Sequence, residues 1–184
     1  MPQNRLDALA QRIKPRATWD DLALPPRDLA RLREIAGTIR QRHAVGPTPD
    51  GPGTGILFSG GTGAVKTQAA EALARDLNLG LFRIDLSAVI SKYVGETEKN
   101  LGRLFDAAKA GGAILLFDEA DALLGKRSKV KDSHERFARI ELDYLLRRIE
   151  AFDGVTILAI KAATPPSPAV LRRLKVVRFP TKKT

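Results

Sequence analysis

The 184-residue sequence contains no cysteine and only two histidines, His43 and His134. Without cysteine the chain has neither a disulfide framework nor a thiolate metal site, and each histidine stands apart from other candidate ligands, so both are expected at the surface. No apolar run approaches the roughly 18 residues that a membrane span needs, and the charged amino terminus lacks the apolar core of a signal peptide. We therefore expect a cytoplasmic chain that does not engage a membrane.

Aromatic residues make up only 5% of the sequence, and the 21 acidic residues are outnumbered by 31 lysines and arginines, which gives a net charge of +10. Such a charge favours nucleic acid as a partner because phosphate contacts supply affinity without sequence preference. The basic clusters, Lys126–Lys131 and the segment from Arg172 to the end, are not interleaved with the aromatics that single-strand binders use for stacking. A solvated surface is therefore favoured over a nucleic-acid groove.

A glycine-rich segment follows the apolar run Ile56–Phe58, and its residues Gly60–Thr67 read Gly-Gly-Thr-Gly-Ala-Val-Lys-Thr. The pattern of a P-loop is G-x-x-x-x-G-K-[ST], and Val65 occupies the place of its last glycine. In such a loop, backbone N–H groups and Lys66 bind the phosphates of a nucleoside triphosphate, and the Thr67 hydroxyl ligates Mg²⁺. If the loop needs positive φ at Val65, the strain costs on the order of 1–2 kcal/mol.

A second segment completes the site, because the apolar run Ala113–Phe117 ends in the carboxylates Asp118 and Glu119. This is the Walker B pattern, and the carboxyl ends of parallel strands are where doubly wound sheets bind ligands. Asp118 is expected to hold Mg²⁺ through water, and Glu119 is expected to be the general base that activates the attacking water.

The segments along the chain alternate as an α/β fold requires. The expected fold is a three-layer α/β/α P-loop NTPase sandwich with a five-stranded parallel sheet. We expect an N-terminal helical segment over residues 1–45, a Pro/Gly-rich loop over 46–55 and the nucleotide-binding unit over 56–184. Helices are expected at Leu6–Ile13, Arg27–Arg42, Lys66–Leu77, Glu96–Ala110 and His134–Phe152, and strands at Gly55–Ser59, Leu81–Leu86, Ala113–Phe117, Val155–Ile160 and Val176–Phe179.

Further motifs add a family resemblance. The order of P-loop, Ser91–Leu101 (SKYVGETEKNL), Asp118–Asp121 (DEAD), Gly125–Arg127 and Ala169–Leu174 resembles the large subdomain of an AAA ATPase of the AAA+ superfamily. The likeness covers roughly Ala17 to Pro180 and is strongest to bacterial AAA ATPases found beside contractile injection systems. It implies a homo-oligomeric ring, usually a hexamer, that hydrolyses ATP at subunit boundaries and remodels or translocates protein.

The resemblance assigns roles to individual positions. Lys92–Gly95 matches the first pore loop, in which Tyr93 would grip an extended polypeptide substrate. Arg172 matches the arginine finger that reaches the γ-phosphate bound by a neighbouring subunit, and Lys175 occupies the second finger position. Lys161 stands where the family has a polar sensor, normally Asn, which orients the attacking water. An ammonium group there can only donate hydrogen bonds and would lower the basicity of Glu119 if the two paired.

Other departures leave alternatives open. Residues 163–168 are proline-rich where the family has an Asp before a Pro, and the chain ends at Thr184, before the position of the family's helical lid. The function expected is an Mg²⁺-dependent ATPase; the alternatives are a degenerate AAA domain that acts as a nucleotide-binding or scaffold module, and a basic nucleic-acid-binding P-loop protein. The candidate site comprises the catalytic residues Glu119, Arg172 and Lys161, the ATP-binding residues Gly60, Gly61, Thr62, Gly63, Ala64, Val65, Lys66, Thr67 and Asp118, and the Mg²⁺ ligands Thr67 and Asp118.

Overall fold

The computed structural model describes residues 10–45, 53–90, 93, 95–108, 112–124, 133–161 and 166–180. Within these ranges the strands form one six-stranded sheet in the order β1-β3-β4-β5-β2-β6. The five strands β2 to β6 are parallel to one another, and β1 pairs with β3 in the antiparallel direction. The strand bounds are β1 Gln11–Ile13, β2 Thr54–Gly60, β3 Gly80–Asp85, β4 Ala113–Asp118, β5 Val155–Ile160 and β6 Lys175–Phe179.

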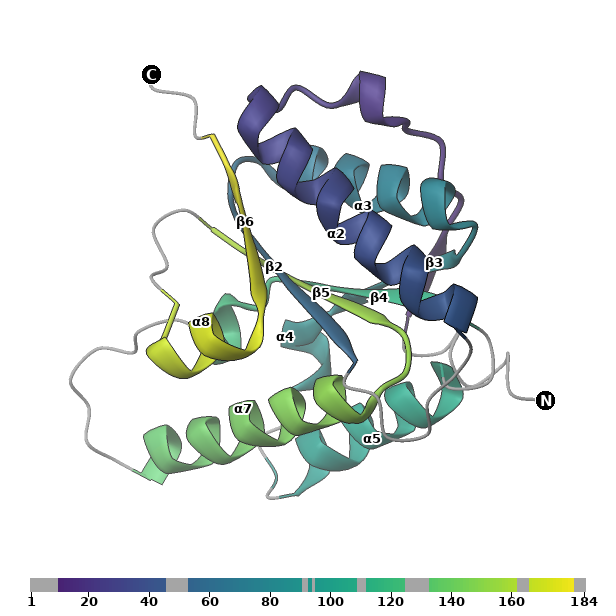
Figure 1. Cartoon of the computed structure of the whole chain (residues 1–184). Helices are drawn as coiled ribbons and strands as arrows, with labels where there is room; N and C mark the ends of the chain where they lie inside the picture. Colours follow the sequence, from purple (N-terminus) through teal and green to yellow (C-terminus); the bar gives the residue numbers. More distant parts are fainter. Residues whose placement is uncertain are drawn as a thin grey trace.

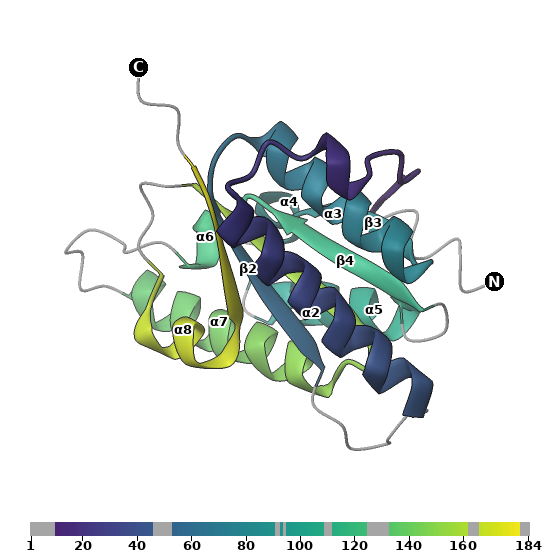
Figure 2. The same ribbon diagram turned by 45° about the horizontal axis from the view of Figure 1, so that its top comes forward.

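Helices cover both faces of the sheet and make three layers (Figures 1 and 2). The face covered by α2 and α3 buries residues such as Leu32 and Leu73 against Ile56 and Ile157. The opposite face is covered by the remaining α-helices, where Leu104 and Leu145 pack with Leu115 and Leu158. The helix bounds are η1 (a 3₁₀ turn) Trp19–Asp21, α2 Pro26–Val45, α3 Gly63–Leu77, α4 Leu86–Val89, α5 Glu96–Ala108, α6 Asp121–Leu124, α7 Ser133–Ala151 and α8 Pro168–Arg173.

The α/β sandwich expected from the sequence is confirmed. The pattern of apolar residues explains most of its helices and strands. In α2 the helical spacing buries Leu32, Ile35 and Ile39 along one face, as a 3.6-residue period requires. The central strand β5 is buried at all six positions, which is typical of a parallel strand covered on both faces.

Two details of the expected architecture are wrong. The sheet has a sixth strand, and that strand lies where a helix over Leu6–Ile13 was expected: Gln11–Ile13 pair in register with Leu81–Arg83 on β3. A three-residue strand is too short for its periodicity to be read, and pairing with β3 overrides the local helical pattern. Residues 6–9, and residues 46–52 of the expected loop, lie outside the described residues, whereas Thr54 and Gly55 belong to β2. Among the described helices, none combines the length and the apolar composition needed to cross a membrane.

Candidate nucleotide site

The glycine-rich segment connects β2 to α3 through a tight turn. Gly60 and Gly61 have φ of 89° and 65°, values that favour glycine. A Cβ atom added to Gly61 would also lie 2.8 Å from the Cβ of Phe179 on β6, so glycine is required there for space as well. Thr62 then caps the helix: its side-chain oxygen accepts a hydrogen bond from the Val65 N–H at 3.3 Å, the usual role of an N-cap threonine.

The expected strain at Val65 is wrong, because Val65 lies inside α3 rather than in a loop. Among the described residues, the only non-glycine positions with positive φ are Asn78 and Glu119. The Val65 side chain is half-buried and packs against the core that α2 and α3 share with the sheet. The helix therefore starts at Gly63, three residues before Lys66, and the Lys66 N–H already donates to the Thr62 carbonyl at 3.3 Å.

Lys66 is the buried cation of the site, with 5% of its surface exposed. Its Nζ donates a 2.7 Å hydrogen bond to the carbonyl oxygen of Ile160, at the carboxyl end of β5. Burial lowers the pKa of Lys66 below its ordinary value of 10.5, while the carboxylates of Asp118 and Asp121 raise it and Lys161 lowers it. These four charged side chains therefore gather at the same edge of the sheet, from α3, β4, α6 and the end of β5.

Asp118 ends β4 beside this lysine, and both of its carboxylate oxygens are engaged. Oδ2 accepts hydrogen bonds from Nε and Nη2 of Arg83 on β3, at 3.0 Å and 2.5 Å, and Oδ1 accepts the N–H of Glu119 at 3.0 Å. The Asp118 side chain is 18% exposed and that of Arg83 is 44% exposed. Glu119 itself is exposed and adopts φ of 55°, which a residue with a Cβ rarely does.

Lys161 follows β5, and its backbone N–H donates to Oδ1 of Asp121 at 3.0 Å. The possible pairing of Lys161 with Glu119 is not found, since no ion pair joins these two described residues. Lys161 stands close enough to Lys66 to lower the pKa of that lysine, so it belongs to the site even though it does not contact the expected base.

The groups at this edge of the sheet are of the types that bind a nucleotide with Mg²⁺. Gly63 and Ala64 are exposed and are the first two residues of α3, whose N–H groups have no acceptor within the helix. No atom lies within 4 Å of a Cβ built on Gly63, so phosphate can approach. A hydroxyl and one carboxylate, from Thr67 and Asp118, suit Mg²⁺, which keeps several waters and takes its other ligands from phosphate. The cradle is shorter than the sequence predicts, because Thr62 already accepts from Val65 and Lys66.

The residues expected to act between subunits lie on the surface. The side chain of Tyr93 is 73% exposed, although Lys92 and Val94 lie outside the described residues. Arg172 on α8 is exposed, and its Nε donates to the carbonyl of Pro168 in the same helix at 3.3 Å. Arg173 differs, because it pairs with Asp143 and Glu150 of α7. Lys175 is exposed at the start of β6.

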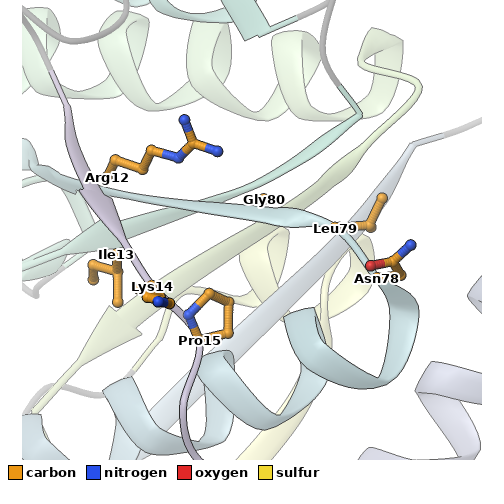
Figure 3. A pocket seen from close by; sticks show the side chains of 7 residues that line it. All are labelled: Arg12, Ile13, Lys14, Pro15, Asn78, Leu79 and Gly80. Carbon is orange, nitrogen blue, oxygen red and sulfur yellow. The ribbon is translucent and has the colours of Figure 1, made fainter.

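A separate hollow of about 530 Å³ lies at the other end of the sheet, where β3 begins (Figure 3). Its walls include Arg12 and Lys14 from the N-terminal segment and Asn78 from the end of α3. None of the predicted site residues lines it, so it is distinct from the nucleotide site. No cluster of three or more His, Cys, Asp or Glu side chains suited to a metal ion occurs among the described residues.

The turn, the capped helix and the acidic strand end lie inside a stretch that matches a known family. Residues 56–181 match the ATPase family associated with various cellular activities (AAA), and the chain belongs to this family. Over 165 residues it is 32% identical to the proteasome-activating nucleotidase of Thermococcus gammatolerans, a match that covers 86% of this chain and 42% of that protein. Over 181 residues it is 33% identical to spastin of Danio rerio, covering 90% of this chain and 30% of spastin.

An uncharacterized AAA family ATPase of Sinorhizobium fredii is 32% identical over 136 residues, which are 74% of this chain and 41% of that protein. The chain thus spans less than half the length of each of these relatives. None of the three is named as an ATPase of a contractile injection system, so the narrower likeness expected from the sequence finds no support here.

Sequence reasoning missed Arg83, which contacts the expected metal ligand. The sequence contains one signal, since Arg83 and Asp85 alternate with apolar residues at the end of a strand and so share one face of it. That signal does not identify the partner of Arg83. Its contact with Asp118 depends on β3 and β4 being neighbours in this register, which the sequence does not show.

Proposed function

We propose that the chain binds ATP with Mg²⁺ at the junction of β2 and α3 and hydrolyses it as one subunit of a ring, usually a hexamer, that remodels or translocates protein. The observation that carries this proposal is that a buried Lys66, the acidic end of β4 and the exposed first residues of α3, Gly63 and Ala64, lie at one edge of the sheet. The family match over residues 56–181 supports the same reading.

Each side chain of the site would have a role that follows from its chemistry. Lys66 and the first N–H groups of α3 would bind the β- and γ-phosphates, for which a helix N-terminus is well suited. Thr67 and Asp118 would hold Mg²⁺, which neutralises charge on the phosphates when it is bound. Glu119 would accept the proton of the attacking water, and Lys161 would donate a hydrogen bond to the reacting groups.

Two further roles depend on assembly. Arg172 has no ion-pair partner among the described residues, so its guanidinium is available to a phosphate held by a neighbouring subunit. Such an arginine stabilises the charge that develops in phosphoryl transfer. Tyr93, with its exposed ring, would contact the polypeptide substrate in the central channel. The domain limits, with the nucleotide-binding unit starting at Thr54 of β2 rather than at residue 56, and a cytoplasmic location belong to the same proposal.

A degenerate AAA module that acts as a binding or scaffold unit is the second candidate. The observations that favour it are the early start of α3, which already uses the N–H groups of Val65 and Lys66, and the engagement of Asp118 by Arg83. Binding without turnover would distinguish this module from the ATPase.

The test is titration with a fluorescent ATP analogue in EDTA and in Mg²⁺, followed by an assay for phosphate release. Glu119→Gln should bind ATP as the parent does and release no phosphate, because the amide is nearly isosteric but cannot accept the proton. Asp118→Ala should lose the part of the affinity that depends on Mg²⁺. Hydrolysis that persists in Glu119→Gln would show that Glu119 is not the base, and a parent that binds without turnover would establish the binding module instead.

A further inference from the structure

The guanidinium of Arg83 contacts the same carboxylate that the proposed function gives to Mg²⁺. Both of its contacts, from Nε at 3.0 Å and Nη2 at 2.5 Å, fall on Oδ2 of Asp118. The contact crosses from one strand to the next, since Asp85, two residues after Arg83, is the register partner of Asp118. Both hydrogen bonds join charged groups and are therefore stronger than hydrogen bonds between neutral groups.

Little of the hydrogen-bonding capacity of Asp118 is left over. A carboxylate has about four acceptor positions, and here Arg83 takes two and the N–H of Glu119 takes one. Glu119, whose φ is 55°, directs its N–H back at Oδ1 of Asp118. Arg83 and this N–H together restrict the orientation of the expected metal ligand.

Asp118 already lies between two cations. Lys66 acts on it from α3, and Arg83 binds it from β3. A divalent ion at Asp118 would be repelled by both of these charges and would share the carboxylate with Arg83, so removal of the arginine should favour binding of the ion.

We propose that Arg83 is a positioning residue that competes with the divalent cation for Asp118 and so sets the Mg²⁺ concentration at which the site loads. This inference rests on the proposed function only in taking the cation to be the one that accompanies ATP. Arg83 holds Asp118 while the cation is absent, and a cation that uses Oδ2 must displace the guanidinium.

The direct test uses Mn²⁺ as a spectroscopic stand-in for Mg²⁺ and needs no nucleotide. Free Mn²⁺ is measured by electron paramagnetic resonance during titration of the parent, Arg83→Gln, Arg83→Lys and Arg83→Gln combined with Asp118→Asn. Arg83→Gln should bind Mn²⁺ about tenfold more tightly, because one positive charge beside a divalent ion is removed. The gain should disappear in the double variant, and Arg83→Lys, which keeps the charge, should stay near the parent.

Arg40→Gln is the matched control, since Arg40 also pairs with an aspartate, Asp76, but on the surface between α2 and α3. It should leave the Mn²⁺ affinity unchanged. Equal or weaker Mn²⁺ binding by Arg83→Gln than by the parent overturns the proposal and leaves Arg83 as a link between strands. Failure of the proposed function looks different, because then no variant binds the ATP analogue in either EDTA or Mg²⁺ while the Mn²⁺ titrations still give their answer.

Discussion

At the scale of the residue, Glu119 is the position where the backbone is least suited to its side chain. Its φ of 55° is in the left-handed region, which costs a residue with a Cβ about 1–2 kcal/mol. Because this residue is the expected base at the end of β4, the strain fits a site at which function rather than stability selects the residue.

We therefore expect Glu119→Gly to raise the free energy of unfolding by about 0.5–1 kcal/mol, since glycine removes the strain but has a more flexible unfolded state. Urea denaturation measures the change. Asn78→Gly is the control, because Asn78 has φ of 54° at the end of α3 and asparagine tolerates that conformation, so its change should be a few tenths of a kcal/mol. A less stable Glu119→Gly chain would mean that the exposed carboxylate makes a favourable contribution which outweighs the strain.

Lys66 gives the molecule a pH dependence with a defined sign. Burial lowers its pKa in the folded chain below the ordinary value of 10.5. Between the lowered pKa and 10.5 the folded chain has lost this proton while the unfolded chain keeps it, so the unfolded state binds more protons and stability rises with pH. Below the lowered pKa both states are protonated, and the full cost of burying the charge is present.

The measurable consequence is a comparison of the parent with Lys66→Met by urea denaturation at several pH values from about 7 to about 10. The stability of the parent relative to Lys66→Met should increase toward the alkaline end, while ATP binding by the variant should be lost at every pH. Lys175→Met, which removes an ammonium group from an exposed position of β6, controls for the change in net charge. A difference between parent and Lys66→Met that stays constant with pH would contradict the burial argument.

At the scale of the element, the start of α3 decides how many N–H groups are available to the proposed phosphate site. Thr62 holds the first turn closed through its side chain and its carbonyl. Thr62→Ala should lower the free energy of unfolding by about 1 kcal/mol, the usual cost of losing an N-cap. Ser167→Ala, which removes the N-cap of the six-residue helix α8, is the comparison.

The effect of ATP on stability should distinguish the loss of the Thr62 cap from the loss of the Ser167 cap. A ligand that binds only the folded state stabilises every variant that binds it, so the quantity to compare is the gain in stability that a saturating ATP analogue gives each chain. In Thr62→Ala the Val65 N–H is released to bind phosphate, and the gain should exceed that of the parent. Ser167→Ala, whose nucleotide site is unchanged, should gain as much as the parent does. Equal gains in the two variants would show that the Val65 N–H does not take part in phosphate binding.

Elements with a clear local pattern could be predicted from the sequence, and those without one could not. Leu32, Ile35 and Ile39 have helical spacing, and Val155–Ile160 is a continuous apolar run of the kind that a buried strand has. The strand β1 has three residues, and the helices α4, α6 and α8 have four to six, which is less than two helical turns, so no helical period shows. These short elements are stabilised by tertiary contacts, such as the pairing of β1 with β3.

The candidate site also has parts that could be predicted from the sequence and parts that could not. The roles proposed for Lys66, Thr67, Asp118 and Glu119 come from motif spacing, and the carboxyl ends of β2, β5 and β4 are neighbours in the sheet. The conformation of Val65 and the partner of Asp118 do not follow, because both depend on tertiary contacts: the first on the cap by Thr62, the second on the order of strands in the sheet.

At the scale of the whole molecule, α8 carries two adjacent arginines with different surroundings. Arg173 forms ion pairs with Asp143 and Glu150 of α7, whereas the side chain of Arg172 donates a hydrogen bond to the carbonyl of Pro168 and forms no ion pair within the described part of the chain. Exposed ion pairs contribute little each, so Arg173→Ala should cost less than about 1 kcal/mol. Arg172→Ala should leave the free energy of unfolding within about 0.5 kcal/mol of the parent.

The two arginines should also differ in activity if the chain works as a ring. Arg172→Ala should remove most phosphate release, because the arginine acts on ATP bound by the neighbour, while Arg173→Ala should keep it. Mixing Arg172→Ala with Glu119→Gln should restore part of the rate, since some interfaces then join an intact Glu119 to an intact Arg172. Mixing Arg172→Ala with Asp118→Ala gives the same rescue by the same logic, and Glu119→Gln with Asp118→Ala should give none, because both changes lie in the same half of the interface. A rate that is indifferent to Arg172→Ala, in a chain that stays monomeric with ATP, would exclude the ring mechanism and favour the binding module.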